Sequence, residues 1–175
     1  MYISKELNKR IERDYFFIQG KINIDCNYFI KKIKQGVEEK ENMSYRTNVK
    51  GKMTSFNFFN NDLNLIKELK KFIIYIDENY SLPAYNLIDS WGFINSPGEK
   101  TDFHTHSRSL FSGVIYLNNC KQPLLFKEID QKVIPKRGAF CLFSSWLSHG
   151  CEVNNTNNSK FGISFNMNEN PNWFT

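Results

Sequence analysis

The chain has 175 residues, of which 41% are hydrophobic and 15% aromatic, and its formal net charge is +5. This composition excludes a disordered or fibrous chain, and no stretch approaches the roughly 20 apolar residues of a membrane-spanning helix. The length predicts a single domain, residues 1–175, that buries a sizeable core.

The first predicted elements are a strand and an amphipathic helix. A short apolar run within residues 14–24 favours the strand. Phe29 and Ile33 then begin a series of apolar residues at three- and four-residue steps, separated by charged residues, which is typical of a helix with one buried face. Asp25 suits the N-cap of this helix, and we expect the helix to end before Asn42.

A second helix is the strongest local prediction. Residues 43–60 are rich in Thr, Asn, Lys and Gly and favour an irregular or hairpin segment. Asn61 or Asp62 then caps a helix whose apolar stripe runs to about Glu78. We expect both helices to be scaffolding packed on a sheet, so that residues 1–84 support the rest of the domain.

Short strand-like segments replace the helical period in the second half of the chain. They are residues 85–94, 111–117, 123–128, 131–134, 139–143 and 161–167. Turn signals rich in Asn, Pro and Gly separate them. Many short strands with such turns favour a sandwich or barrel. The predicted fold class is therefore mainly β with N-terminal helices (α+β).

Three histidines, the only ones in the chain, suggest a metal site: His104, His106 and His149. Residues i and i+2 of a strand point to the same face, so the first two, on a strand or at its rim, can hold one ion together. His149 would come from another strand across the mouth of the same barrel. Three imidazoles with open positions opposite suit Fe(II), Zn(II) or Cu better than Mg or Ca. A double-stranded β-helix, the cupin-like jelly roll, accommodates this site.

Other interpretations of these residues are open from the sequence. His104 and His106 could be surface loop residues, and His149 a hydrogen-bonded core histidine. Asp102 also lies at an even offset from His104, so its carboxylate is an alternative ligand to His106.

Cysteine spacing and charge distribution predict the compartment and the partners. The four cysteines are far apart and form no CxxC pair, which favours free buried thiols in a reducing compartment. The N-terminus shows no basic stretch followed by an apolar one, so we expect a cytoplasmic protein without a membrane partner. The excess of basic residues lies in residues 1–84, interleaved with acidic ones, and a nucleic-acid partner is not expected.

Six blocks, in this order and spacing, carry a resemblance to a known family. They are residues 90–95 (SWGFIN), 104–106 (HTH), 110–118 (LFSGVIYLN), 135–138 (PKRG), 143–150 (FSSWLSHG) and 160–166 (KFGISFN). Over roughly residues 85–168 the chain resembles the 2-oxoglutarate- and Fe(II)-dependent oxygenases of bacteria and their phages. The resemblance implies a double-stranded β-helix that binds Fe(II) and 2-oxoglutarate, uses O2 as co-substrate, and oxidises a substrate while releasing succinate and CO2.

The resemblance also implies residue roles. The superfamily usually binds iron through His-x-Asp/Glu and a distal His, and here His106 stands at the carboxylate position, which leaves the ion its full +2 charge. A basic residue about ten positions after the distal His holds the far carboxylate of 2-oxoglutarate. Lys160 stands eleven positions after His149, where the family commonly has Arg. Tyr116 stands where prolyl-hydroxylase-like enzymes donate a phenol to that carboxylate.

Four further residues have expected places. Ser164 shares the predicted strand face of Lys160, and Asn95 points toward the metal mouth from a neighbouring strand. We expect both to help bind the cofactor. Trp91 and Trp146 are expected to be packing residues rather than residues that stack on a substrate.

The leading interpretation is an oxidoreductase, a 2-oxoglutarate- and Fe(II)-dependent dioxygenase acting as a hydroxylase. A cupin-like three-His dioxygenase or isomerase that does not use 2-oxoglutarate is the first alternative, and Lys160 discriminates between the two. A catalytically inactive phage-type binding protein is the second alternative. The substrate, a small molecule or a protein side chain, is not readable because outer-pocket residues come from loops without a recognisable code. The sequence is also compatible with a homodimer.

Overall fold

A computed structural model describes residues 14–39, 47–80 and 85–169 of the chain. The helices in these residues are α1 (Cys26–Glu38) and α2 (Leu63–Tyr80). The strands are β1 (Phe17–Lys21), β2 (Lys52–Met53), β3 (Tyr85–Asn95), β4 (Thr101–His104), β5 (Phe111–Tyr116), β6 (Leu124–Phe126), β7 (Gln131–Val133), β8 (Ala139–Ser144), β9 (His149–Cys151) and β10 (Lys160–Glu169). The chain is therefore mainly β with two helices in its first half, as predicted.

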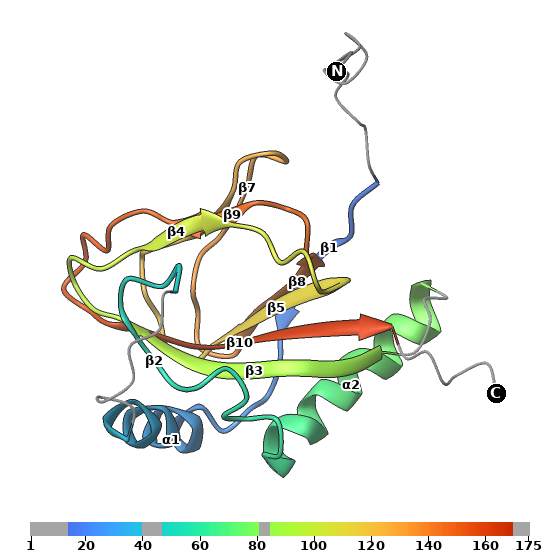
Figure 1. Cartoon of the computed structure of the whole chain (residues 1–175), viewed down its shortest axis with the longest axis horizontal. Helices are drawn as coiled ribbons and strands as arrows, with labels where there is room; N and C mark the ends of the chain where they lie inside the picture. Colours follow the sequence, from blue (N-terminus) through green and yellow to red (C-terminus); the bar gives the residue numbers. More distant parts are fainter. Residues whose placement is uncertain (1–13, 40–46, 81–84, 170–175) are drawn as a thin grey trace, which may run out of the picture.

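The strands form two antiparallel sheets that face each other (Figure 1). The larger sheet has the strand order β1-β8-β5-β10-β3-β2, and the smaller one has the order β4-β9-β6-β7. Figure 1 shows α1 and α2 on one side of the larger sheet and β4, β7 and β9 on its other side. The result is a β-sandwich with helices on one outer face.

Hydrogen-bonded caps fix where both helices begin. The Asp25 side chain accepts hydrogen bonds from the backbone N–H groups of Asn27 and Tyr28, both at 3.1 Å. Asp62 caps α2 in the same way by accepting from backbone N–H groups of its first turn. The Asp62 carboxylate also accepts from Lys32 Nζ at 2.7 Å, which ties α2 to α1. Both predicted N-caps are confirmed.

Strand alternation gives the larger sheet two different faces. On β10, Ile163 and Met167 belong to the apolar core beneath the helices. Lys160, Ser164 and Asn166 point the other way and line a pocket between the two sheets. The prediction that Lys160 and Ser164 share a face is confirmed, and Asn166 joins them because the side chains of a strand alternate with a period of two residues. The face of the sheet turned to the interior of the sandwich therefore carries these polar side chains beside an apolar cluster that includes Phe93 and Val114.

The sequence predicts strands that carry His104 and His149, which are β4 and β9, but it gives no bounds for them or for the short strand β2. Each has two to four residues, too few for alternation to emerge from the pattern. The predicted irregular segment 43–60 is described from residue 47 onward, and its first residues lie outside the described part of the chain. All four cysteines are buried and free, as predicted. Neither helix of the described residues combines the length and apolar character needed to cross a membrane.

Candidate metal centre

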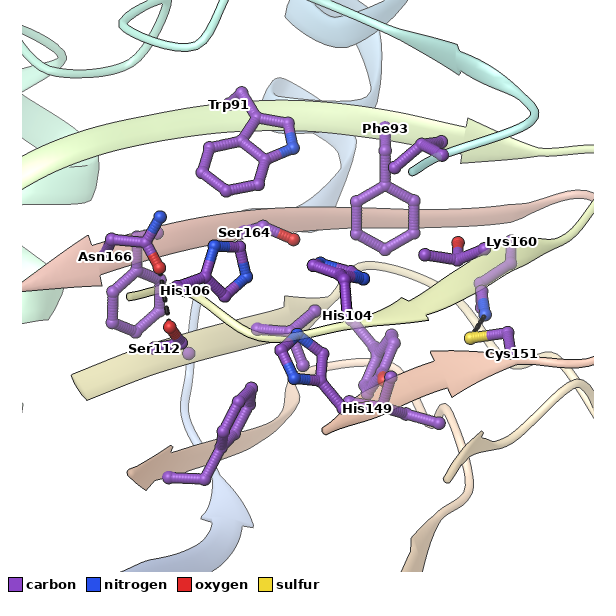
Figure 2. A pocket seen from close by; sticks show the side chains of 18 residues that line it. Trp91, Phe93, His104, His106, Ser112, His149, Cys151, Lys160, Ser164 and Asn166 are labelled. Carbon is purple, nitrogen blue, oxygen red and sulfur yellow. Dashed lines mark hydrogen bonds between the residues drawn. The ribbon is translucent and has the colours of Figure 1, made fainter. Parts of the chain in front are cut away.

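The three histidines come together between the sheets. His104 ends β4, His149 begins β9, and the two lie opposite each other in the strand register. His106 lies just beyond the end of β4, at the rim rather than in the strand. One nitrogen from each ring lies within 4.8 Å of the others, and Figure 2 shows the rings turned toward one another. Because metal–imidazole bonds are about 2.1 Å long, one ion can contact all three after small side-chain rotations.

A bulge in β4 decides which of its residues face the pocket. Thr101 pairs with Cys151 and His104 with His149, so β4 has one residue more than β9 between the same two pairs. Thr101 and His104 therefore both line the pocket, although they are three residues apart. A bulge of this kind shifts the alternation of a strand by one residue.

The same bulge removes Asp102 from the set of metal ligands. Its carboxylate pairs with Lys50 Nζ at 3.1 Å and with Lys100 Nζ at 2.9 Å, on the outside of the sandwich. These two ammonium groups lower the pKa of Asp102, with the hydrogen bond from Lys100 as the larger cause. In the part of the chain that the structure describes, the residue that completes the cluster is His106. The alternative ligand proposed from the even offset is therefore wrong.

Backbone carbonyls set the tautomers of two ligands. His104 Nδ1 lies 2.8 Å from the carbonyl oxygen of Asp102, and His149 Nδ1 lies 2.9 Å from that of Leu147. A carbonyl only accepts, so each Nδ1 must carry the hydrogen and donate it. This leaves Nε2 of both rings with a free lone pair for a cation, the usual arrangement of metal-binding imidazoles.

Burial keeps all three imidazoles neutral. Desolvation lowers the pKa of His104 below its usual value. Desolvation, with a smaller contribution from the neighbouring His104, lowers the pKa of His106 to about 4 and that of His149 to about 3. At neutral pH no proton competes with a cation for these nitrogens. Neutral nitrogen donors favour Fe(II), Zn(II) or Cu over Mg and Ca.

The cluster lies in a narrow pocket between the sheets, with a cavity volume of about 60 Å³ and an opening to solvent. Among the described residues that line it, Lys160 is the only one with a formal charge, and none is Asp or Glu. The pocket is therefore electropositive even before a cation binds.

Lys160 is a buried cation at one end of this pocket. Its side chain is 1% exposed, and Nζ donates a hydrogen bond to Cys151 Sγ at 3.0 Å and lies 6.0 Å from the centre of the Phe93 ring. None of the ion pairs found in the described residues involves it. Tyr116 lines the same pocket, and burial raises its pKa well above the usual value, so its phenol stays protonated. A buried ammonium without a carboxylate is costly, so this end suits an anion.

Two residues expected at the cofactor have different placements. Ser164 lines the pocket and lies opposite Trp91 in the register of β10 and β3. Asn95 is fully buried but lies outside the pocket lining, and its Nδ2 donates to Thr101 Oγ1 at 3.2 Å. It therefore reaches the pocket only through Thr101. Asn95 therefore contacts Thr101 of β4 and does not itself line the pocket around the histidines.

The opposite end of the pocket holds residues that sequence reasoning missed. Trp91 packs in the apolar cluster between the sheets, as predicted, and it also lines the pocket with its ring centre 6.4 Å from that of His106. Ser112 Oγ donates to Asn166 Oδ1 at 2.6 Å, and Asn166 Nδ2 donates to Asp89 at 2.7 Å. The shared strand faces could have identified Ser112 and Asn166, since each lies an even number of residues from a predicted site residue.

Comparisons with known proteins support the fold. No protein-family model matches the sequence, and no curated protein is detectably similar to it. Solved structures do match. The viral collagen prolyl hydroxylase of Paramecium bursaria Chlorella virus-1, in complex with 2-oxoglutarate, is 16% identical with a TM-score of 0.68, and the match covers 89% of this chain and 96% of that one.

Two bacterial structures are also similar. A prolyl-4-hydroxylase of Pseudomonas putida is 13% identical with a TM-score of 0.62 over 88% of this chain and 92% of that one. HygX of Streptomyces hygroscopicus, with nickel and 2-oxoglutarate bound, is 9% identical with a TM-score of 0.59 over 90% of this chain and 83% of that one. At such identities the likeness establishes that the chain shares the fold of these proteins.

Proposed function

We propose that the protein is an Fe(II)- and 2-oxoglutarate-dependent dioxygenase, an oxidoreductase that hydroxylates its substrate. The observation that carries this proposal is that one pocket holds both a neutral three-His cluster and a buried lysine without an ion-pair partner among the described residues. Structures of the same fold that contain 2-oxoglutarate, and in one case also nickel, support it.

The proposal extends to the architecture of the domain. The two facing sheets would be the halves of a double-stranded β-helix, with residues 85–168 as the catalytic core of a single domain. Residues 1–84 would support it, because α1 and α2 pack beneath the larger sheet and β1 and β2 form its edges. The metal then lies between the sheets, where the last residue of β4 meets the first of β9.

The donor set fits Fe(II). His104 and His149 would coordinate through Nε2, since their Nδ1 atoms are engaged by backbone carbonyls, and His106 would complete the set. Bound Fe(II), 2-oxoglutarate and O2 would supply the oxidising chemistry, in which 2-oxoglutarate becomes succinate and CO2 as the substrate is hydroxylated. The apolar walls of the sandwich exclude bulk water from this chemistry.

The Lys160 end of the pocket would hold the far carboxylate of 2-oxoglutarate. Lys160 would form an ion pair with this carboxylate, and the protonated phenol of Tyr116 would donate a hydrogen bond to it. Ser164 lies further along the same face of β10, toward the metal cluster, where its hydroxyl can reach the metal-proximal part of the cofactor. Asn95 would act indirectly, by holding Thr101 in the pocket wall.

Calorimetric titration of 2-oxoglutarate into the anaerobic Fe(II)-loaded protein tests the proposal. Truncating one partner of a desolvated charge pair costs roughly 3–5 kcal/mol, so Lys160→Ala should weaken binding by about a hundredfold or more. Lys160→Arg should retain most of the affinity, because a guanidinium also pairs with a carboxylate. Lys127→Ala, at a lysine whose side chain is 64% exposed, is the matched control. Absence of 2-oxoglutarate binding to the unaltered protein would refute the proposal.

One observation favours a second candidate function. None of the described residues that line the pocket carries a carboxylate, so His106 stands where a carboxylate ligand is usual in the superfamily. A three-His dioxygenase or isomerase that does not use 2-oxoglutarate would need no such ligand, but it would leave the buried Lys160 without a purpose. Metal binding without 2-oxoglutarate binding would favour this candidate.

The substrate of the proposed hydroxylase is a protein side chain or a small molecule. Neighbours of the same fold are described both as prolyl hydroxylases and as an enzyme solved with the small molecule hygromycin B bound. Both substrate classes occur among proteins of this fold, so the substrate class depends on which groups the pocket residues can contact.

A further inference from the structure

Trp91 is a buried residue whose polar atom has no partner. Its side chain is 6% exposed and lines the pocket. The indole Nε1 makes no hydrogen bond within the described part of the chain. Figure 2 shows this nitrogen on the edge of the indole that is turned toward Phe93, on the inner side of the pocket. A buried donor left without an acceptor costs free energy, so this N–H is available for a ligand.

The indole is held firmly beside the metal cluster. The ring of Phe56 packs edge-on against it with centres 5.3 Å apart. The backbone N–H of Ser90, the preceding residue on β3, donates to the carbonyl of Phe56 at 2.9 Å. On the other side, the Trp91 ring centre lies 6.4 Å from that of His106. These contacts hold the indole ring beside His106, with its N–H edge turned toward Phe93.

This donor is well separated from the Lys160 end. In the register of β10 and β3, Lys160 pairs with Asn95 and Ser164 pairs with Trp91. The two ends are therefore four residues apart along the strand, or about 13 Å at roughly 3.3 Å per residue. The backbone positions of Trp91 and Lys160 therefore lie at different ends of the pocket.

Asn166 adds a second donor to the same end. Its Oδ1 already accepts from Ser112, and one hydrogen of Nδ2 is given to Asp89. An amide nitrogen has two hydrogens, so one N–H is uncommitted in the described residues. Ser112 has no hydrogen left to donate, because its hydroxyl donates to Asn166 and can only accept from Ser145 Oγ at 2.8 Å. This end of the pocket therefore offers N–H donors to a ligand.

We propose that Trp91 is a specificity-determining residue that donates its indole N–H to a carbonyl-type oxygen of the substrate, an amide carbonyl or a carboxylate. The inference rests on the proposed function and names the substrate chemistry of the same pocket. Three neutral imidazoles leave Fe(II) at +2, and Lys160 adds one charge, so a bound 2-oxoglutarate dianion leaves the pocket with a net positive charge. A carboxylate therefore binds more tightly at Trp91 than a neutral amide does.

Indole NMR of the Zn(II)-loaded protein with 2-oxoglutarate tests the inference, because Zn(II) is diamagnetic. The chain has three tryptophans, Trp91, Trp146 and Trp173, and Trp91→Phe identifies the Trp91 resonance by its loss. The probes are N-methylacetamide and acetate as acceptors and methylammonium as a donor-only control. Both acceptors should shift the Trp91 indole proton downfield, with acetate effective at lower concentration, and methylammonium should leave it unchanged.

The dissociation constants of N-methylacetamide and acetate for Trp91→Phe, compared with the unaltered protein, give a second readout. Trp91→Phe should weaken binding of N-methylacetamide about 2- to 10-fold and of acetate about 10-fold or more, the range of one hydrogen bond to a neutral or charged acceptor. Trp146→Phe, at a tryptophan outside the pocket lining, should change neither. An unmoved Trp91 resonance, an equal response to methylammonium, or equal affinities in Trp91→Phe would overturn the inference.

The titration is repeated without 2-oxoglutarate to separate this inference from the function on which it rests. Failure of 2-oxoglutarate to bind the metal-loaded protein refutes the proposed function. The response of the Trp91 indole to the two acceptors still decides whether this donor forms a binding subsite.

Discussion

The two faces of the larger sheet are built from the same strands but have opposite chemistry. Along β10, Ile163 and Met167 lie in the apolar core beneath α1 and α2. On the other face of the same strand, Lys160, Ser164 and Asn166 line the pocket. Apolar burial on the first face stabilises the fold, whereas a buried ammonium on the second costs free energy. Apolar burial on the helix-covered face therefore offsets the free-energy cost of the buried ammonium on the pocket face.

The largest expected effect on the pocket face comes from the metal ligands. His149→Ala should abolish stoichiometric Fe(II), because the donor atoms of His104, His106 and His149 form one set within 4.8 Å of one another. Metal analysis after anaerobic loading measures this, with Ser148→Ala as the neighbouring control. Unchanged iron content in the single alanine variants of all three histidines would contradict the site.

The helix-covered face should respond in stability alone. Ile163 is fully buried, and Ile163→Ala should lower the free energy of unfolding by about 2–5 kcal/mol through lost burial and a residual cavity. The dissociation constant for 2-oxoglutarate should stay within about twofold, because the side chain points away from the pocket. Urea unfolding and calorimetry measure the two quantities. A variant of normal stability with weakened 2-oxoglutarate binding would break the division between the faces.

Lys160→Met, in contrast to Ile163→Ala, should raise the free energy of unfolding. It replaces a buried ammonium that has no carboxylate partner among the described residues by an apolar chain of similar length. The metal-free protein should therefore gain about 1–3 kcal/mol in the free energy of unfolding, while 2-oxoglutarate binding is lost. If Lys160→Met instead lowers the free energy of unfolding, Lys160 has a structural role in the fold, which contradicts the prediction.

The smallest predicted effect is a pH dependence of the metal-free protein. Burial depresses the pKa of folded His149 to about 3, so as pH falls below its unfolded value of about 6.5 only the unfolded state takes up the proton. His149 thus contributes stability above pH 6.5 that is lost progressively below it, by about 1 kcal/mol at pH 5.5. Urea midpoints from pH 5 to 8 should fall less steeply in His149→Gln. Parallel curves for the two proteins would contradict this assignment.

Much of the fold follows from local patterns in the sequence. The apolar stripe and the Asp62 cap were enough to predict α2, and strand alternation predicted that Lys160 and Ser164 share a face. Both signals are local, because a helix or strand repeats its burial pattern within a few residues. The three-His cluster was predictable because the chain contains no other histidine to confuse the pattern.

The features that were missed depend on contacts between distant segments. The bulge that turns Asp102 outward arises from the pairing of β4 with β9, and the three residues of β9 are too few to show a period. The contact of Lys160 with Cys151 joins two strands, and no local pattern marks it. Trp91 looked like a packing residue because an unpartnered indole N–H is visible only in three dimensions.

Anaerobic equilibrium dialysis of radiolabelled 2-oxoglutarate against Fe(II)-loaded proteins tests the central claim, that the histidine cluster and Lys160 form one ligand site. The unaltered protein and Asp102→Ala should each bind one equivalent of 2-oxoglutarate, since Asp102 faces outward and pairs with Lys50 and Lys100. His149→Ala and Lys160→Ala should bind almost none, because each removes one of the two anchors. Full binding in both of these variants, or none in the unaltered protein, would contradict a shared site for metal and 2-oxoglutarate.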